Sequence, residues 1–116
     1  MYVLPVFAMM AKADRKREWD KTFKALGHPI RRELMCLLDK SEGDTVQINQ
    51  VSNHLATTQD ITTERAKMKL LHFHLPKLQE FGFIDYDTRS GTIRYQKHES
   101  MEEILDSELL SSSVCC

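Results

Sequence analysis

The sequence predicts a mainly α-helical fold with a small β-hairpin, which is an α+β arrangement. Leucines recur at helical spacing through residues 70–81, LLHFHLPKLQEF. Gly82 then ends the helix, and residues 83–87, FIDYD, form a short strand-like segment. A helix that passes through a glycine directly into a hairpin is typical of a winged helix-turn-helix. We therefore expect this fold, with a helical extension at its N-terminal end and another at its C-terminal end.

Composition favours one compact domain, because the chain has 116 residues of which 41% are hydrophobic. The formal net charge is only -1, but the charges are unevenly distributed. Residues 61–98 carry seven Lys/Arg against four Asp/Glu, whereas residues 99–116 carry five acids and no base. The middle of the chain is therefore basic and its C-terminal part acidic, so a nucleic-acid partner is compatible with the sequence.

The cysteine spacing and the first ten residues indicate a cytoplasmic protein. Three cysteines at positions 36, 115 and 116 do not make the evenly spaced framework of a small secreted domain. The segment MYVLPVFAMM is apolar but too short to span a bilayer, and it lacks the features of a signal peptide. We expect a soluble protein without membrane contact, cytoplasmic and associated with the nucleoid.

The chain is expected to divide into four parts. They are an apolar arm that packs on its own domain or on a second subunit, the winged helix-turn-helix domain, a C-terminal helix suited to dimerisation, and a flexible tail: 1–13, 14–98, 99–110 and 111–116.

Three amphipathic helices are expected before the polar linker at residues 56–61. The apolar stripes that indicate them are, in chain order, Trp19, Phe23 and Leu26; Ile30, Leu34, Leu37 and Leu38; and Ile48, Val51 and Leu55. Gly27 ends the first helix, which covers residues 14–26. Pro29 opens the second, because a proline at the first helical position gives up no hydrogen bond. Cys36 lies within the second stripe and is expected to be a small core residue.

The fourth helix, residues 62–81, is the predicted recognition helix, with Thr62 or Asp60 as its N-cap. At a constant 100° per residue, one strip is apolar and is expected to face the core: Met68, Leu71, Leu75 and Leu78. The opposite side carries Thr62, Arg65, Lys69 and His72, with Phe73 beside them. Pro76 cannot donate to the carbonyl of His72, so a kink is expected between these two residues.

The predicted wing is a hairpin over residues 83–96 that turns at Arg89, Ser90 and Gly91. After it, Ser100 and Glu103 have the spacing of a capping box for a last helix. That helix has an apolar stripe made of Met101, Ile104, Leu105 and Leu109.

Residues 19–98 resemble the winged helix-turn-helix regulators of the arsenic-repressor type (ArsR-like). ALGHPIRRELMCLL is similar to their opening L-x-[NH]-P-x-R-R, and HFHLPKLQEFGFIDYD to their H-L-x-x-L-x-x-x-G-[hydrophobic] motif. The His-Leu-Pro-Lys-Leu version is most similar to an uncharacterised winged-helix domain that recurs in archaeal proteins. The resemblance implies the fold and a DNA-binding role. Metal sensors of that type carry paired cysteines or a His/Asp set, whereas residues 45–52 here are TVQINQVS, so no metal sensing is expected.

These features together lead us to expect a sequence-specific regulator of transcription that binds double-stranded DNA. The fourth helix would enter the major groove, where Arg65 suits a bidentate contact to guanine and Lys69 suits a phosphate. The hairpin would contact the backbone or the minor groove. The candidate DNA-binding residues are Thr62, Thr63, Arg65, Lys69, His72, Lys77, Arg89 and Arg94.

A second function fits the same residues. The charges on the fourth helix also suit an ordinary solvated face, so the alternative is a winged-helix protein–protein interaction module without DNA binding. For the DNA-binding regulator we expect a homodimer joined through residues 2–10 and the last apolar stripe, which are too apolar for free tails.

Neither a metal site nor catalysis is expected. His72 and His74 diverge by about 200° around a helix and therefore do not chelate one ion. His74 lies beside the apolar strip and is expected to be a hydrogen-bonded, partly buried residue. The four glycines show no Gly-x-Gly spacing, and nothing gathers a nucleophile with its base, so we expect no cofactor and no enzyme.

Overall fold

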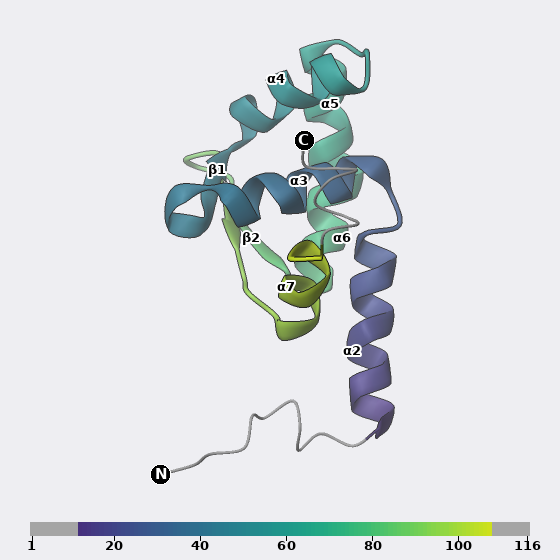
Figure 1. The fold of residues 1–116 in the computed structure, drawn as a ribbon. Coiled ribbons are helices and arrows are strands. Elements are labelled where there is room, and N and C mark those ends of the chain that lie inside the picture. Colours follow the sequence, from purple (N-terminus) through teal and green to yellow (C-terminus); the bar gives the residue numbers. More distant parts are fainter. Residues whose placement is uncertain (1–11, 108–116) are drawn as a thin grey trace.

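The computed structural model describes residues 12–107 and is mainly helical with one small antiparallel sheet (Figure 1). Its elements are α2 (Lys12–Ala25), α3 (Pro29–Lys40), the 3₁₀ turn η1 (Glu42–Asp44), β1 (Thr45–Gln47), α4 (Ile48–Thr58), α5 (Thr63–Lys69), the π-helical turn η2 (Leu70–His74), α6 (Leu75–Glu80), β2 (Ile84–Asp87), β3 (Thr92–Tyr95) and α7 (Glu99–Leu105). This order is that of a winged helix-turn-helix with a helix added at each end, so the predicted fold class is confirmed. Most of the expected arm, residues 1–11, and the whole expected tail lie outside the described residues.

The sheet has three strands in the order β1-β3-β2, and both neighbouring pairs are antiparallel. β2 and β3 form the predicted hairpin. β1 was not predicted, and it adds to the other edge of β3 with Val46 opposite Ile93. The hairpin turn is tied to the start of α4, because the Ile48 N–H donates to the Gly91 carbonyl at 2.8 Å. The φ angle of Gly91 is 70°, a left-handed conformation that favours glycine there.

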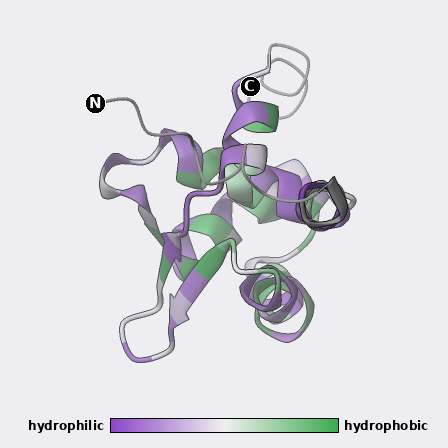
Figure 2. Ribbon diagram, turned by 90° about the horizontal axis from the view of Figure 1, so that it is seen from below, coloured by the Kyte–Doolittle hydropathy of each residue, from purple (hydrophilic) through white to green (hydrophobic). Residues whose placement is uncertain are grey.

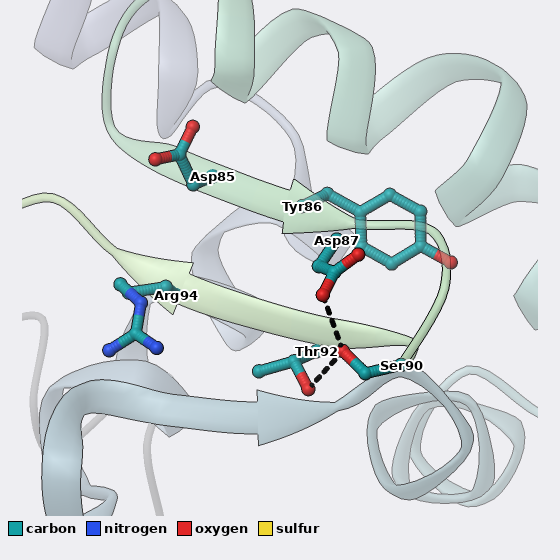
Figure 3. Close-up of a pocket in the computed structure, with 6 residues that line it drawn as sticks. All are labelled: Asp85, Tyr86, Asp87, Ser90, Thr92 and Arg94. Atoms are coloured by element: carbon teal, nitrogen blue, oxygen red, sulfur yellow. Dashed lines mark hydrogen bonds between the residues drawn. The ribbon is translucent and has the colours of Figure 1, made fainter.

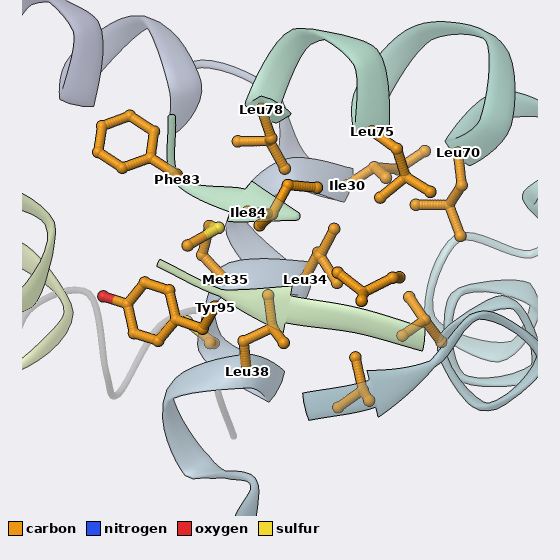
Figure 4. Packing of buried hydrophobic residues seen from close by; sticks show 14 of the residues in the cluster. Ile30, Leu34, Met35, Leu38, Leu70, Leu75, Leu78, Phe83, Ile84 and Tyr95 are labelled. Carbon is orange, nitrogen blue, oxygen red and sulfur yellow. The ribbon is translucent and has the colours of Figure 1, made fainter. Parts of the chain in front are cut away.

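The core lies between α3, the recognition helix and the inner face of the sheet (Figure 4). Leu34 and Leu38 of α3 are fully buried, as is Leu78 of α6 and Ile93 of β3. Cys36 is also in this core, at 3% exposure, as predicted. Figure 2 shows hydrophobic and hydrophilic residues alternating along the helices and strands, as expected for elements buried on one side.

The corner between α2 and α3 is held by side chains of α3. The Arg31 guanidinium donates to the carbonyls of Ala25 at 2.7 Å and Lys24 at 3.0 Å, and Arg32 donates to the Leu26 carbonyl at 2.9 Å. These carbonyls are at the C-terminal end of α2, where no further turn of helix supplies donors. The two arginines therefore fix the direction in which α3 leaves α2.

The predicted apolar stripe of α2 is wrong at Phe23, whose side chain is 57% exposed. The buried side of α2 instead includes Thr22, at 0% exposure, and Ala25. The Thr22 hydroxyl is 2.6 Å from the Ser100 hydroxyl of α7, so α7 sets which side of α2 turns inward. Phe23 stays outside, where its ring lies 5.7 Å from that of the half-buried Trp19.

The predicted capping box at Ser100 is also wrong. The N-cap of α7 is His98, two residues before the predicted one, and Ser100 is fully buried against Thr22. Met101 and Leu105 of the same helix belong to the core at 0% and 3% exposure. Two residues of the last apolar stripe are therefore covered by the chain itself, Ile104 is partly buried, and Leu109 lies outside the described residues.

The predicted recognition helix, which keeps that name below, runs without interruption from Thr63 to Glu80 through α5, η2 and α6. Its N-cap is Thr62, whose hydroxyl accepts the Arg65 N–H at 3.1 Å, which decides between the two predicted caps. η2 is a wide turn in which the Leu75 N–H bonds to the Leu70 carbonyl, five residues back. The kink expected near Pro76 is thus replaced by a π-helical turn directly before it.

The π-helical turn explains why the predicted core strip of this helix is partly wrong. Leu75 and Leu78 are buried as predicted, but Leu71 is half-buried and Met68 is 59% exposed. Four of the buried residues are instead spaced by four: Ala66, Leu70, His74 and Leu78. A regular α-helix would rotate residues at this spacing out of line, whereas a wider turn keeps them on one side. The assumption of 100° per residue therefore fails between Leu70 and His74.

Candidate nucleic-acid interface

The outward face of the recognition helix gathers three of the predicted DNA-contacting residues. Arg65, Lys69 and His72 line a shallow hollow of about 400 Å³ together with Met68 and Phe73. Arg65 and His72 are exposed and Lys69 is half-buried. Two permanent cations and one histidine therefore project from a single face, while Ala66 and Leu70 hold the other side of the helix in the core.

The same face carries two large apolar side chains that are open to solvent. Met68 is 59% exposed and Phe73 is 68% exposed. Sequence reasoning assigned Met68 to the core, because the π-helical turn that moves it outward gives no signal in the apolar spacing. The face is consequently more apolar than predicted, with hydrophobic groups set among the cations.

The remaining helix residues of the predicted set lie at the two ends of this face. Thr62 is exposed but its hydroxyl is engaged as the N-cap, and Thr63 is half-buried. Lys77 lies on α6 beyond the hollow, and its ammonium is 5.1 Å from the centre of the Phe81 ring, a cation–π contact. The structure therefore does not place Lys77 with Arg65 and Lys69.

The tip of the wing presents Arg89. Asp87 organises this turn, because one of its carboxylate oxygens accepts from the Arg89 N–H at 3.0 Å. The other accepts from the Ser90 hydroxyl at 2.9 Å (Figure 3). The Arg89 side chain is exposed. With the turn bonded through Gly91 to the start of α4, Arg89 is attached to the helix-turn-helix rather than to a freely moving loop.

Arg94 lies elsewhere, on the outer face of the sheet. It lines a hollow of about 350 Å³ with Asp85, Asp87 and neighbouring polar residues (Figure 3). Asp85 is its direct cross-strand neighbour. Two acidic residues and one arginine line this hollow, so this part of the wing lacks the basic surface that the sequence suggested.

Behind the outward face, His74 is buried as predicted, at 5% exposure. Its Nδ1 atom is 3.2 Å from the Arg31 guanidinium, and its ring centre is 4.4 Å from that of His28. Burial, and then the nearby His28, Arg31 and Lys69, lower the pKa of His74 to about 4. Burial and the same arginine also lower the pKa of His28, whose Nδ1 accepts the Ile30 N–H as the N-cap of α3. Both rings are therefore neutral near pH 7.

Among the described residues, no three His, Cys, Asp or Glu side chains gather as metal ligands. Within residues 12–107, no helix is both long and apolar enough to cross a membrane.

A family model described as a domain of unknown function (DUF7344) matches residues 23–94, more than half of the chain. The chain belongs to this family. No curated protein and no solved structure matches it significantly. The DUF7344 region begins in α2 and ends in β3, so it contains the helix-turn-helix and the hairpin but leaves α7 outside.

Proposed function

We propose that this DUF7344 chain is a sequence-specific transcription regulator that binds double-stranded DNA. The observation that carries the proposal is the outward face of the recognition helix. Arg65, Lys69 and His72 project there from a helix whose opposite side is fixed in the core. A helix presented in this way fits the major groove of B-DNA.

Each residue of that face has a role in the proposal. Arg65 offers the planar fork that pairs with the O6 and N7 atoms of guanine, which reads sequence. Lys69 neutralises a phosphate, which adds affinity that depends on salt but not on sequence. Arg89, at the wing tip, reaches the adjacent backbone or the minor groove. Arg94 contributes little, because the acidic residues Asp85 and Asp87 line the same hollow.

The proposal predicts steep salt dependence of binding to duplex DNA. Affinity for a duplex of random sequence should fall between about 50 and 200 mM salt, and the slope of log affinity against log salt should become shallower by about one to two in an Arg65→Ala/Lys69→Ala variant. Fluorescence anisotropy with a labelled duplex measures both slopes.

A matched control removes the same charge from another helix. Lys16→Ala/Lys24→Ala deletes two exposed lysines of α2 and should leave the slope near that of the wild type. If both double variants reduce the salt slope equally, DNA binding depends on the net charge of the protein and not on the face of the recognition helix. A wild-type protein without salt-sensitive binding at micromolar concentration contradicts the proposal.

The alternative function is a protein–protein interaction module without DNA binding. The exposure of Met68 and Phe73 favours it, because large apolar side chains on a surface often mark protein interfaces. In that case the salt experiment shows no duplex binding, and substitution of these two residues abolishes capture of the partner.

The proposal also covers assembly and location. We propose a homodimer, as is common for regulators that read two half-sites, and a cytoplasmic, nucleoid-associated protein without a catalytic role or a cofactor.

A further inference from the structure

Apolar and cationic side chains alternate along the outward face of the recognition helix. Met68 and Phe73 are the two most exposed large apolar residues of this helix, and they share one hollow with Arg65, Lys69 and His72. An apolar surface in this position is unexplained if DNA binding needs only phosphate contacts. Its neighbours Arg65 and Lys69 complement a polyanion.

The major groove contains one apolar group that such side chains can meet, the C5-methyl of thymine. Cytosine differs there in lacking this methyl group and in offering a donor. Apolar contact with the methyl is therefore a way of reading thymine without a hydrogen bond. Covering one methyl group favours binding by about fourfold.

We propose that Phe73, supported by Met68, reads thymine methyl groups in the DNA site, so that the protein selects thymine at a fixed distance from a guanine bound by Arg65. This rests on the proposed function and names the sequence feature that the same surface recognises. Phe73 is the main reading residue, since its exposure of 68% exceeds that of Met68 at 59%.

The position of Phe73 is fixed by the helix around it. It lies within η2, where the Leu75 N–H bonds to the Leu70 carbonyl. Its neighbour His74 is buried and bonded to Arg31 at 3.2 Å. A side chain anchored on both sides can select one position in a groove, whereas one on a frayed helix end cannot.

The spacing along the helix gives the spacing in the DNA. Arg65 and Phe73 are eight residues apart, which is roughly 12 Å at the rise of an α-helix. Consecutive base pairs are about 3.4 Å apart along one strand, so a helix lying along the groove spans about three to four base pairs between these side chains. The thymine is therefore expected about three or four base pairs from the guanine.

The experiment uses the full chain and replaces thymine by deoxyuridine, which lacks only the methyl group. Duplexes are first selected from a random pool by binding to the wild-type protein. Each enriched thymine is then replaced singly by deoxyuridine, and the affinity is measured by anisotropy at constant salt. At one or two positions we expect a loss of about three- to tenfold for the wild type. In a Phe73→Ala variant, thymine and deoxyuridine should bind equally at those positions.

Two controls keep the result interpretable. His54→Ala removes an exposed side-chain ring from α4, outside the residues that line the hollow, and it should retain the wild-type preference for thymine. Met68→Ala should reduce the preference without abolishing it. Circular dichroism and thermal unfolding show whether each variant keeps its fold.

The outcomes separate the inference from the proposed function. If the wild type binds selected duplexes in a salt-sensitive way but does not distinguish thymine from deoxyuridine, the methyl inference is overturned and DNA binding stands. A Phe73→Ala variant that keeps the wild-type preference overturns it as well. If no duplex binds at all, the proposed function itself fails, and the exposed apolar pair then points to a protein partner.

Discussion

At the scale of single residues, His74 is a buried histidine at the contact between α3 and the recognition helix. Its position beside an apolar strip predicted burial, and the structure confirms it. Its partners were not predictable, because Arg31 and His28 are far away in sequence and reach it only through the packing of α3 on the recognition helix. The exposure of Phe23 was not predictable either, because contacts with α7, which is distant in sequence, determine which side of α2 is buried.

The lowered pKa of His74 predicts a pH-dependent contribution to stability. The folded chain holds His74 with a pKa of about 4, below its ordinary 6.5, so the unfolded chain binds more protons between these values. The stabilisation is complete above pH 6.5 and is lost as the pH falls toward 4. Urea unfolding measures the free energy of unfolding of wild type and of His74→Leu at about pH 7.5 and pH 4.5. Between these pH values the wild type should lose on the order of 2 kcal/mol more than the variant.

Asp39 makes this difference measurement necessary. Burial and the neighbouring Glu102 raise the pKa of Asp39 to about 6, which lowers stability as the pH rises through the same window. Because Asp39 is present in both proteins, its effect cancels in the difference. Gln50→Leu, at an exposed residue of α4 that does not titrate, is the control and should differ from wild type by the same amount at both pH values. A His74→Leu difference that is also unchanged with pH contradicts the prediction.

At the scale of elements, the helices and the hairpin were predictable and two features were not. Apolar spacing, Gly27, Pro29 and Gly82 placed the helix boundaries to within a few residues. β1 was not predicted, because its three residues, Thr45–Gln47, are too few to show a periodic pattern. They form a strand only through pairing with β3. The turn η2 was not predicted, because its buried residues are four apart. This spacing also occurs in a regular α-helix, so it does not indicate a wider turn.

The turn η2 predicts unusual tolerance to a deletion. A π-helical turn contains one residue more than the α-helix it interrupts, so removing the exposed Phe73 should convert residues 63–80 to a regular helix. His74, Leu75 and Leu78 then follow Ala66 and Leu70 at normal helical spacing and remain in the core. We expect a loss of stability of at most about 2 kcal/mol in urea unfolding, with helical circular dichroism retained.

Deletion of Asn53 is the matched comparison, because it is an exposed residue in the regular helix α4. Its removal rotates Leu55, which is fully buried, away from the core by about 100°. It should therefore destabilise the fold more than the Phe73 deletion does, by about 3 kcal/mol or more. The reverse order of stabilities would contradict this account of η2.

At the scale of the whole molecule, the winged helix-turn-helix was predictable because its elements follow one another in a fixed order. The distribution of charge over the surface was not, because it depends on which strands become neighbours. Arg94 appeared basic in the sequence, but Asp85 lies directly opposite it on β2. The association of two copies is also a property of the whole molecule, and the exposed Phe23 of α2 is the residue considered for it.

The exposed ring of Phe23 on α2 predicts how two copies would meet. Met101 and Leu105 of the α7 stripe are buried within the chain and Ile104 is partly buried, whereas Phe23 is 57% exposed, so we propose the Trp19–Phe23 pair as a surface for a second subunit. Sedimentation equilibrium should give about twice the chain mass of 13.5 kDa. Phe23→Glu should shift the equilibrium toward the monomer, because a dimer would bury its charge without a partner. Phe73→Glu introduces the same charge at an exposed ring on the recognition helix and should leave the dimer intact. A wild-type protein that is monomeric at high concentration would exclude the homodimer, and equal effects of the two substitutions would exclude α2 as its interface.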